Sequence, residues 1–214
     1  MIITDDIARK AADHFAKHDP VIAELVVEFG LCPIRAHTDH YRELVESIMG
    51  QQLSVSAARA INHRFLKLFG GIFPSPDILA ARDPDDLRAI GLSYRKADYI
   101  KDLAAHIIEG KVQFTHLPDL SNQEIVAEMT AVKGIGEWTV HMFLIFCMAR
   151  SDVLPVGDLG IKNAVQVKYN IGHRPIPGEI EAIAAANAWH PYESIAAWYL
   201  WQSLGNKPAL TTTI

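Results

Sequence analysis

Residues 130–163 hold the side chains of this chain whose types and spacing could do chemistry. A helical pattern of apolar residues ends at Val132, and Gly134 and Gly136 follow with a tolerance for positive φ. A second helical pattern starts at once, so a Gly-Ile-Gly turn joins two helices. Glycines let a backbone approach a phosphate closely, and the first N–H groups of the second helix point at the anion. The segment predicts a helix-hairpin-helix that binds DNA without reading a base.

Asp158 is the candidate for catalysis in the same stretch, because it follows a Pro-Val-Gly loop and precedes another helical pattern. The partial positive charge of a helix N-terminus favours an ionised carboxylate, and an N-cap role alone would explain an Asp at this position. An ionised carboxylate can also stabilise a cationic transition state, orient an attacking water, or do both. The loop by itself favours capping and does not separate the two chemical roles.

The elements that must position these residues are predicted to be about ten helices in an all-α fold, because strand signals are nearly absent. Thr4 or Asp5 and Ser54 are expected N-caps, and Gly30 is expected to end a helix. Besides the two helices of the hairpin, helical segments are expected at residues 4–18, 21–29, 41–49, 55–68, 85–90, from 95 onward, 161–169, 179–188 and 192–204.

The composition is that of a globular protein with a substantial core, since 50% of the 214 residues are hydrophobic and 21% are charged. No stretch approaches the roughly 20 apolar residues that span a bilayer, and the N-terminus lacks the pattern of a signal peptide. Cys32 and Cys147 stand far apart in apolar surroundings, which favours two buried free thiols over a disulfide. We therefore expect a soluble, intracellular protein.

The charge of the chain argues against a protein that coats nucleic acid, because the net charge is -5 and such proteins carry a basic footprint. The distribution is more informative than the sum. Between residues 130 and 174, five basic residues stand against three acidic ones, whereas the N-terminal arm and residues 77–86 are acid-rich. This pattern indicates a modest basic face with weak non-specific affinity for DNA.

Several stretches carry a resemblance to a known family, and they occur in the family's order. They are Ile48–Val55, Gly91–Ala97, Val132–Thr139, Pro155–Lys162, Trp189–Tyr192 and Trp198–Trp201. Over nearly the whole chain they resemble the helix-hairpin-helix DNA glycosylase superfamily, and within it 3-methyladenine DNA glycosylase II. The chain looks like the compact form, which lacks the N-terminal β-rich domain of larger bacterial relatives.

The resemblance implies two helical lobes with the active-site cleft between them. Lobe one is expected at approximately 1–36 plus 151–214, and lobe two at approximately 37–150 with the hairpin at 130–150. The implied activity is that of a monofunctional DNA glycosylase in base excision repair. Such an enzyme flips alkylated purines such as 3-methyladenine out of duplex DNA and hydrolyses the N-glycosidic bond.

The implied partner is double-stranded DNA with alkylated bases, and neither a cofactor nor a membrane is expected. We expect a monomer, located in the cytoplasm or nucleoid of a bacterium or in the nucleus of a eukaryote. Relatives that also cut the strand have a nucleophilic Lys where this chain has Trp138. Because Trp cannot form a Schiff base, no lyase activity is expected.

The resemblance also assigns roles to single residues. Asp158 becomes the catalytic carboxylate, whether or not it also caps its helix. Gln52 and Leu53 are candidates for a wedge that fills the gap left by a flipped base, although their turn alone could be a plain connector. The base pocket is expected to be aromatic and apolar, and its candidates are Trp138, Trp201, Met142, Leu159 and Val55. Core packing is retained for Trp189 and Trp198.

Contacts to the DNA backbone are expected from the hairpin and from the helix after Asp158. The candidates are Lys133, Gly134, Gly136, Thr139 and Lys162. No metal is required, but the resemblance allows a monovalent cation on the carbonyl groups of Thr130, Val132 and Ile135. The chain departs from the family at Lys133, where the hairpin usually has Pro, and at Glu193, where an Arg is usual.

Two other functions stay open on the sequence alone. The first is a non-catalytic helix-hairpin-helix module that holds DNA, and the second is a helical scaffold for proteins without DNA affinity. A binding module needs neither a carboxylate at position 158 nor an aromatic pocket with Trp201. Production of heat-stable abasic sites from methylated DNA would therefore separate the enzyme from both alternatives.

Overall fold

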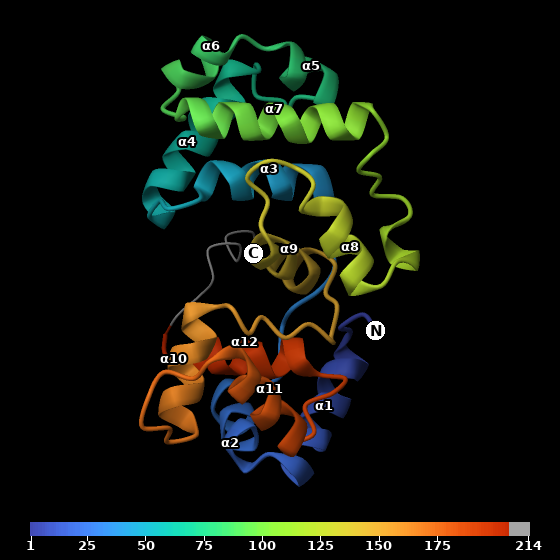
Figure 1. The fold of residues 1–214 in the computed structure, drawn as a ribbon, viewed down its shortest axis with the longest axis vertical. Coiled ribbons are helices and arrows are strands. Elements are labelled where there is room, and N and C mark those ends of the chain that lie inside the picture. Colours follow the sequence, from blue (N-terminus) through green and yellow to red (C-terminus); the bar gives the residue numbers. More distant parts are fainter. Residues whose placement is uncertain (206–214) are drawn as a thin grey trace. The chain divides into compact units, whose positions relative to one another are not determined.

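The computed structural model describes residues 1–205, and within them it contains twelve α-helices joined by turns and loops (Figure 1). The all-α fold expected from the sequence is confirmed. The helices are α1 (Asp5–His18), α2 (Pro20–Phe29), α3 (His40–Gly50), α4 (Val55–Leu68), α5 (Pro76–Ala81), α6 (Pro84–Ala89), α7 (Tyr94–Ile108), α8 (Asn122–Met129), α9 (Glu137–Met142), α10 (Leu159–Lys168), α11 (Pro177–Ala186) and α12 (Glu193–Ser203). Among these helices, none is long and apolar enough to cross a bilayer.

The side chains predicted to be N-caps of α1 and α4 do cap these helices. Thr4 Oγ1 accepts a hydrogen bond from the Ile7 N–H at 3.2 Å, and Ser54 Oγ accepts one from the Ala57 N–H at 3.3 Å. Each cap satisfies one of the N–H groups that a helix start leaves without an intrahelical partner. Both N-caps expected from the sequence are therefore confirmed.

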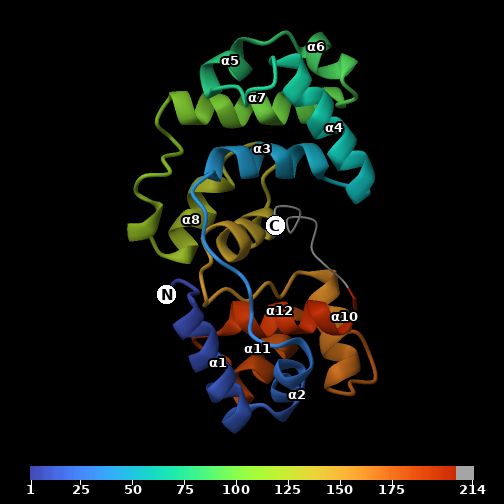
Figure 2. The same ribbon diagram turned by 180° about the vertical axis from the view of Figure 1, so that it is seen from behind.

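The first of two compact units consists of Met1–Thr38 and the described part of the chain from His141 onward. In it α2 contacts α1 and α12, and α12 contacts α10 (Figure 2). Asp19, between α1 and α2, is fully buried. Its Oδ2 accepts hydrogen bonds from the Tyr169 hydroxyl at 2.5 Å and from Trp189 Nε1 at 2.6 Å. These donors compensate the desolvation of the carboxylate, which makes Asp19 a structural residue.

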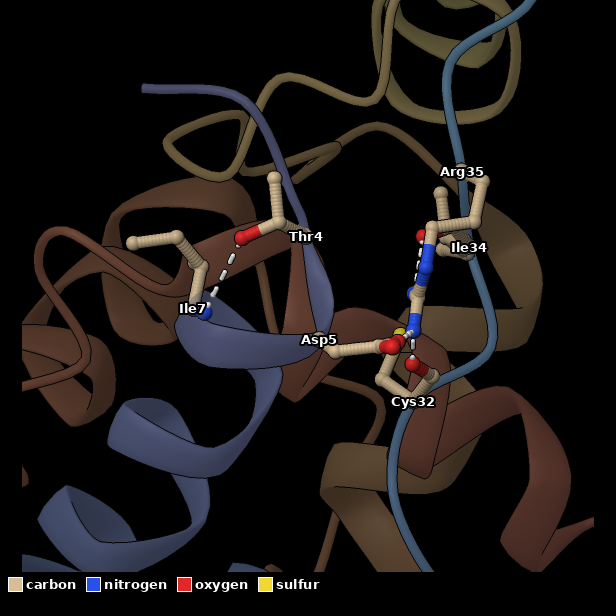
Figure 3. Close-up of polar contacts among 6 residues, drawn as sticks. All are labelled: Thr4, Asp5, Ile7, Cys32, Ile34 and Arg35. Carbon is tan, nitrogen blue, oxygen red and sulfur yellow. Dashed lines mark hydrogen bonds and ion pairs between the residues drawn. The ribbon is translucent and has the colours of Figure 1, made fainter.

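Arg35, in the segment after α2, forms hydrogen bonds within that segment and an ion pair with the first residue of α1 (Figure 3). Its guanidinium donates to the carbonyl groups of Cys32 at 3.1 Å and Ile34 at 2.6 Å, and it pairs with the carboxylate of Asp5. Cys32 and Cys147 are both buried, and neither takes part in a disulfide, as the sequence predicts.

The second compact unit is Asp39–Val140, and α7 is its central helix. Helix α7 contacts α3, α5 and α6, while α3 also contacts α4 (Figure 1). The sequence does not predict α5, because Pro74 and Pro76 read as interruptions. The helix forms because Ser75 is its N-cap and Pro76 lies in its first turn, where a missing N–H costs nothing.

The second helix of the hairpin is shorter than its apolar pattern predicts. Helix α9 ends at Met142, and Phe143–Cys147 continues as a π-helical segment whose residues are all buried. The boundary between the two compact units falls within α9, after Val140. A run in which every residue is apolar has no helical phase, so the sequence cannot distinguish an α-helix from a π-helix there.

Candidate functional site

Asp158 lies in the first compact unit as the N-cap of α10, which the capping pattern predicts. Its Oδ1 accepts a hydrogen bond from the Ile161 N–H at 2.8 Å and another from the indole Nε1 of Trp201 at 2.8 Å. Both N–H donors fix the orientation of this carboxylate, which faces the partial positive charge of the helix N-terminus. The arrangement holds an anionic group in one orientation, which is the requirement for stabilising a cation that develops during a reaction.

Gly160 leaves room for the contact between Asp158 and Trp201. A Cβ atom at position 160 would lie 3.0 Å from Asp158 Oδ1 and 3.0 Å from Trp201 Cδ1. Trp201 is only 2% exposed, and its ring centroid lies 5.5 Å from that of Phe146. Because packing and a hydrogen bond both restrain the indole, Trp201 can orient the carboxylate. The sequence does not predict this contact.

The other candidates in the first unit differ in exposure. Met142 is fully buried at the end of α9, whereas Leu159, the first residue of α10, is 57% exposed. Lys162 lies half-buried on α10, and its N–H donates to the backbone carbonyl of Asp158 at 3.0 Å. Leu159 and Lys162 therefore lie within one turn of Asp158 on the same helix.

The hairpin turn between α8 and α9 lies in the second unit, and a hydrogen bond from the Ile135 N–H to the Val132 carbonyl group closes it at 3.1 Å. Gly134 has a φ of 81°, and a Cβ atom there would lie 2.0 Å from Cδ2 of Tyr99. The fold itself therefore requires glycine at position 134. Gly136 differs from the expectation, because its backbone is not left-handed and a Cβ atom would meet nothing within 4 Å.

Lys133 is held at the hairpin by Asp102 of α7. The Lys133 N–H donates to Asp102 Oδ2 at 2.9 Å, and Lys133 Nζ lies 3.3 Å from Asp102 Oδ1. Although burial opposes ionisation, the hydrogen bonds from Lys133 lower the pKa of the Asp102 carboxyl group below its ordinary value. Part of the Lys133 charge is thus neutralised within the protein, which the sequence does not reveal.

The loop between α3 and α4 contains the wedge candidates and is tied to the hairpin. Lys96 Nζ donates to the carbonyl groups of Met49 at 2.8 Å and Gln51 at 2.7 Å, and burial lowers the pKa of this amine. Gln51 Nε2 donates to the Gly134 carbonyl group at 2.9 Å. Gln52 and Leu53 follow these anchors, and both are exposed. The structure therefore brings the expected wedge and the expected phosphate contact together.

The remaining candidates of the second unit lie near the starts of helices. Val55 begins α4 and is 54% exposed, and Trp138 in the first turn of α9 is 41% exposed. Thr139 is only 5% exposed. Trp138 and Val55 thus present apolar surface, while the Thr139 side chain is packed within the fold.

Sequence reasoning missed Tyr99 and Asp102, which shape the hairpin turn from α7. The sequence does show that both residues lie one or two turns after Lys96 on the same helical segment. Their contacts join residues about thirty positions apart, and local spacing cannot show such contacts.

The carbonyl groups of Thr130, Val132 and Ile135 lie on the hairpin turn, where neutral oxygen atoms suit a monovalent cation better than a transition metal. The Val132 oxygen already accepts the Ile135 N–H at 3.1 Å. A carbonyl oxygen has two lone pairs, so this hydrogen bond leaves room for a second interaction. The donor set therefore fits such a cation.

Comparison with solved structures gives two close matches. The first is DNA-3-methyladenine glycosidase from Bacillus halodurans, with 33% identity, a TM-score of 0.82 and coverage of 91% of this chain and 89% of that one. The second is Schizosaccharomyces pombe 3-methyladenine DNA glycosylase in complex with abasic DNA, with 33% identity, a TM-score of 0.78 and coverage of 92% and 97%.

Sequence comparison agrees with the structural matches. DNA-3-methyladenine glycosylase 1 of Schizosaccharomyces pombe is 38% identical over 167 residues, which are 76% of this chain and 72% of the relative. Residues 45–189 match the model of the HhH-GPD superfamily of base excision DNA repair proteins. This match includes Asp158, the hairpin and the loop with the wedge candidates Gln52 and Leu53. The chain therefore belongs to the HhH-GPD superfamily of base excision DNA repair proteins.

Proposed function

We propose that the protein is a monofunctional DNA glycosylase that removes alkylated purines, with 3-methyladenine as the representative substrate. The observation that supports this function most directly is the Asp158 carboxylate, held by the α10 N-terminus and by Trp201 Nε1. A relative that is 33% identical has been solved with abasic DNA, which is the product of base removal. The protein would act on duplex DNA as a monomer inside the cell.

The first step is extrusion of the damaged base, because its glycosidic bond is inaccessible within the duplex. Gln52 and Leu53 are proposed to fill the resulting gap. Gln52 has a φ of 58° although it is not a glycine, a conformation that costs on the order of 1–3 kcal/mol. Leu53, which is 36% exposed, offers the apolar surface that can replace a base in the stack. The anchors at Lys96 and Gln51 support this unusual backbone.

The chemical step breaks the bond between the sugar and the base. The bond electrons leave with the base, and the sugar becomes an oxocarbenium-like cation that the Asp158 carboxylate stabilises electrostatically. A water oxygen then forms the new bond to the sugar carbon, and its proton passes to the solvent. Since 3-methyladenine is already cationic in DNA, it departs as a neutral base without a general acid.

The base pocket is proposed to use aromatic and apolar side chains. The indole of Trp138 is exposed and can stack on a cationic base. Trp201 is proposed to act mainly through Asp158, since its ring is nearly buried. Met142, Leu159 and Val55 remain pocket candidates on the resemblance. The position of Trp138 also supports a mechanism without a Schiff base, so borohydride should trap no covalent complex with DNA.

Phosphate contacts are proposed at the hairpin, through Lys133, Gly134 and Gly136, and separately at α10, through Lys162. Thr139 stays a candidate on the resemblance alone, because its side chain is packed within the fold. Gly136 supports this role most clearly, because a bare backbone permits close approach of a phosphate and no atom of residues 1–205 lies within 4 Å of its Cβ position. A monovalent cation on the hairpin carbonyl groups would add positive charge at the same place.

The test is a panel of duplexes that each carry one lesion: 3-methyladenine, 7-methylguanine, ethenoadenine or hypoxanthine. We expect heat-stable abasic sites with 3-methyladenine under single-turnover conditions, and no strand cleavage before alkali treatment. DNA binding without release of any base would contradict the proposed function and favour a binding module. Failure to bind DNA at all would favour the protein scaffold.

A further inference from the structure

Helix α4 presents a basic row on the side opposite its packed side. Arg59, His63 and Lys67 recur every four residues, so they share one face of the helix, and all three are exposed. The buried residues Ile61 and Phe65 point the other way. Helix α4 thus packs with an apolar face, and the basic row of Arg59, His63 and Lys67 lies on its exposed side.

The surrounding sequence leaves this charge without compensation. Residues 47–76 contain no Asp or Glu, although the chain has 25 acidic residues and a net charge of -5. Within residues 1–205, no acidic side chain pairs with any member of the basic row. Some other exposed cations are paired within the protein, for example Lys10 with Asp6 and Lys111 with Glu109. An unpaired row of cations on an acidic protein is a complementary surface for a polyanion.

The basic row begins next to the loop that carries the wedge candidates. Ser54 caps α4 directly after Gln52 and Leu53, and Arg59 follows in the second turn of the helix. The other end of the row borders a shallow, open hollow of ≈ 470 Å³ lined by His63, Leu66, Lys67, Gly70 and Gly71. Among the described residues, neither Gly70 nor Gly71 has an atom within 4 Å of where its Cβ would stand, so the surface is open at these two positions.

We propose that the basic row of Arg59, His63 and Lys67 is a second DNA-backbone contact, which binds consecutive phosphates of the duplex to one side of the lesion. This inference rests on the proposed function because it takes DNA as the partner. At 1.5 Å per residue, Arg59 and Lys67 are about 12 Å apart along the helix. That length corresponds to roughly three to four base pairs at 3.4 Å each. Because the row would contact phosphates only, it would not distinguish base sequences. Its length would set how much duplex the protein needs on that side of the lesion.

The first test compares the salt dependence of binding to an undamaged 30-base-pair duplex by fluorescence anisotropy. For the variant Arg59→Gln/Lys67→Gln, we expect the slope of log K against log salt to decrease by about two, since each phosphate contact contributes about 0.9. Affinity should fall roughly tenfold at moderate salt. The charge-matched control Lys10→Gln/Lys111→Gln should keep the wild-type slope, because both lysines are paired within the protein. The variant Arg59→Lys/Lys67→Arg, which keeps both charges, should restore it.

The second test uses duplexes that carry a stable abasic-site analogue and end four base pairs from it, on either one side or the other. Wild type should lose affinity on truncation of one side only, and the neutral double variant should be insensitive to that truncation. Equal slopes for the double variant and wild type, or equal sensitivity to truncation on both sides, would overturn the proposal. A protein that passes both tests but releases no 3-methyladenine would contradict the proposed function alone, because neither test requires excision. Thermal melting of each variant checks that the fold is intact.

Discussion

The indole Nε1 of Trp201 donates a 2.8 Å hydrogen bond to Oδ1 of Asp158, the same oxygen that caps α10. One carboxylate oxygen thus connects the helix start to a residue of α12 that is 43 positions away. Because both donors are in place in the free protein, the negative charge is oriented before DNA binds. In the proposed mechanism, a site built in this way needs little reorganisation when positive charge develops on the sugar.

Asp158→Asn should abolish excision and leave binding to abasic DNA nearly unchanged. Asn is as good an N-cap as Asp, and its carbonyl oxygen can accept both existing hydrogen bonds, so the fold should be retained. Loss of the charge should raise the barrier by about 3 kcal/mol or more, a hundredfold or greater decrease in rate. Single-turnover excision of 3-methyladenine measures this decrease in rate. Asp83→Asn is a matched control because Asp83 caps α6 in the other unit, and near-wild-type excision by Asp158→Asn would remove Asp158 from the mechanism.

Trp201→Phe should separate the hydrogen bond from the ring. Phe keeps an aromatic ring near Phe146 but cannot donate to Asp158, and a hydrogen bond to a charged group contributes about 1.5–3 kcal/mol. We expect the excision rate to fall by at least about tenfold with unchanged affinity for abasic DNA. Trp201→Ala should lose more with 3-methyladenine than with neutral hypoxanthine if the ring also stacks on a cationic base. Wild-type rates for Trp201→Phe would show that the indole N–H is dispensable.

The two glycines of the hairpin should respond to substitution in opposite ways. Gly134→Ala should destabilise the fold by about 2 kcal/mol or more, because the new Cβ would overlap Tyr99 and a left-handed φ disfavours alanine. Gly136→Ser should melt at or above the wild-type temperature, since Ser is a better cap than Gly at a helix start. The same variant should bind DNA roughly tenfold more weakly, a change of 1.4 kcal/mol. Undiminished DNA affinity of Gly136→Ser would exclude close approach of a phosphate at this residue.

Glu43 should make stability depend on pH. Burial, together with the nearby Glu46 and Asp39, raises the pKa of Glu43 to about 7 from its ordinary 4.5. The folded state favours the protonated carboxyl group, so the contribution to stability is greatest below pH 4.5 and is lost as the pH rises to about 7. Glu43→Gln mimics the neutral form.

The melting temperature of Glu43→Gln should therefore exceed that of wild type at pH 8, by roughly 3–8 °C, and should match it near pH 4.5. Glu28→Gln, at an exposed glutamate of α2, is the control and should show no such dependence. A difference between Glu43→Gln and wild type that is the same at both pH values would contradict the shift.

The sequence predicts those features of the site that depend on neighbouring residues. Asp158 is an N-cap because of the residues on either side of it, and the hairpin follows from a Gly-Ile-Gly turn between two apolar helical patterns. The turn after α3 is likewise marked by the run from Gly50 to Ser54, whereas its proposed role as a wedge comes from the resemblance. In each case the responsible forces act within about five residues, which is the range over which spacing is informative.

The remaining features depend on packing between distant segments. The contacts of Trp201 with Asp158, Gln51 with the Gly134 carbonyl group, and Lys133 with Asp102 join residues that are 43, 83 and 31 positions apart. No periodicity encodes these pairs, because they form only once α12 has packed on α10 and α7 on α3. The sequence therefore identifies the chemical groups but not the partners that orient or neutralise them.

Gly136 has a consequence for sequence divergence. The fold constrains Gly134 through Tyr99 and a left-handed φ, but in the described part of the chain no contact within 4 Å constrains position 136. In a descendant that stopped binding DNA, Gly134 would still be selected for folding, while position 136 would drift toward residues that cap helices better. A homologue with the first glycine and a Ser or Asp in place of the second is then expected to retain the hairpin and to have lost the phosphate contact. On the proposed phosphate contact, the second glycine would indicate which copies still act on DNA.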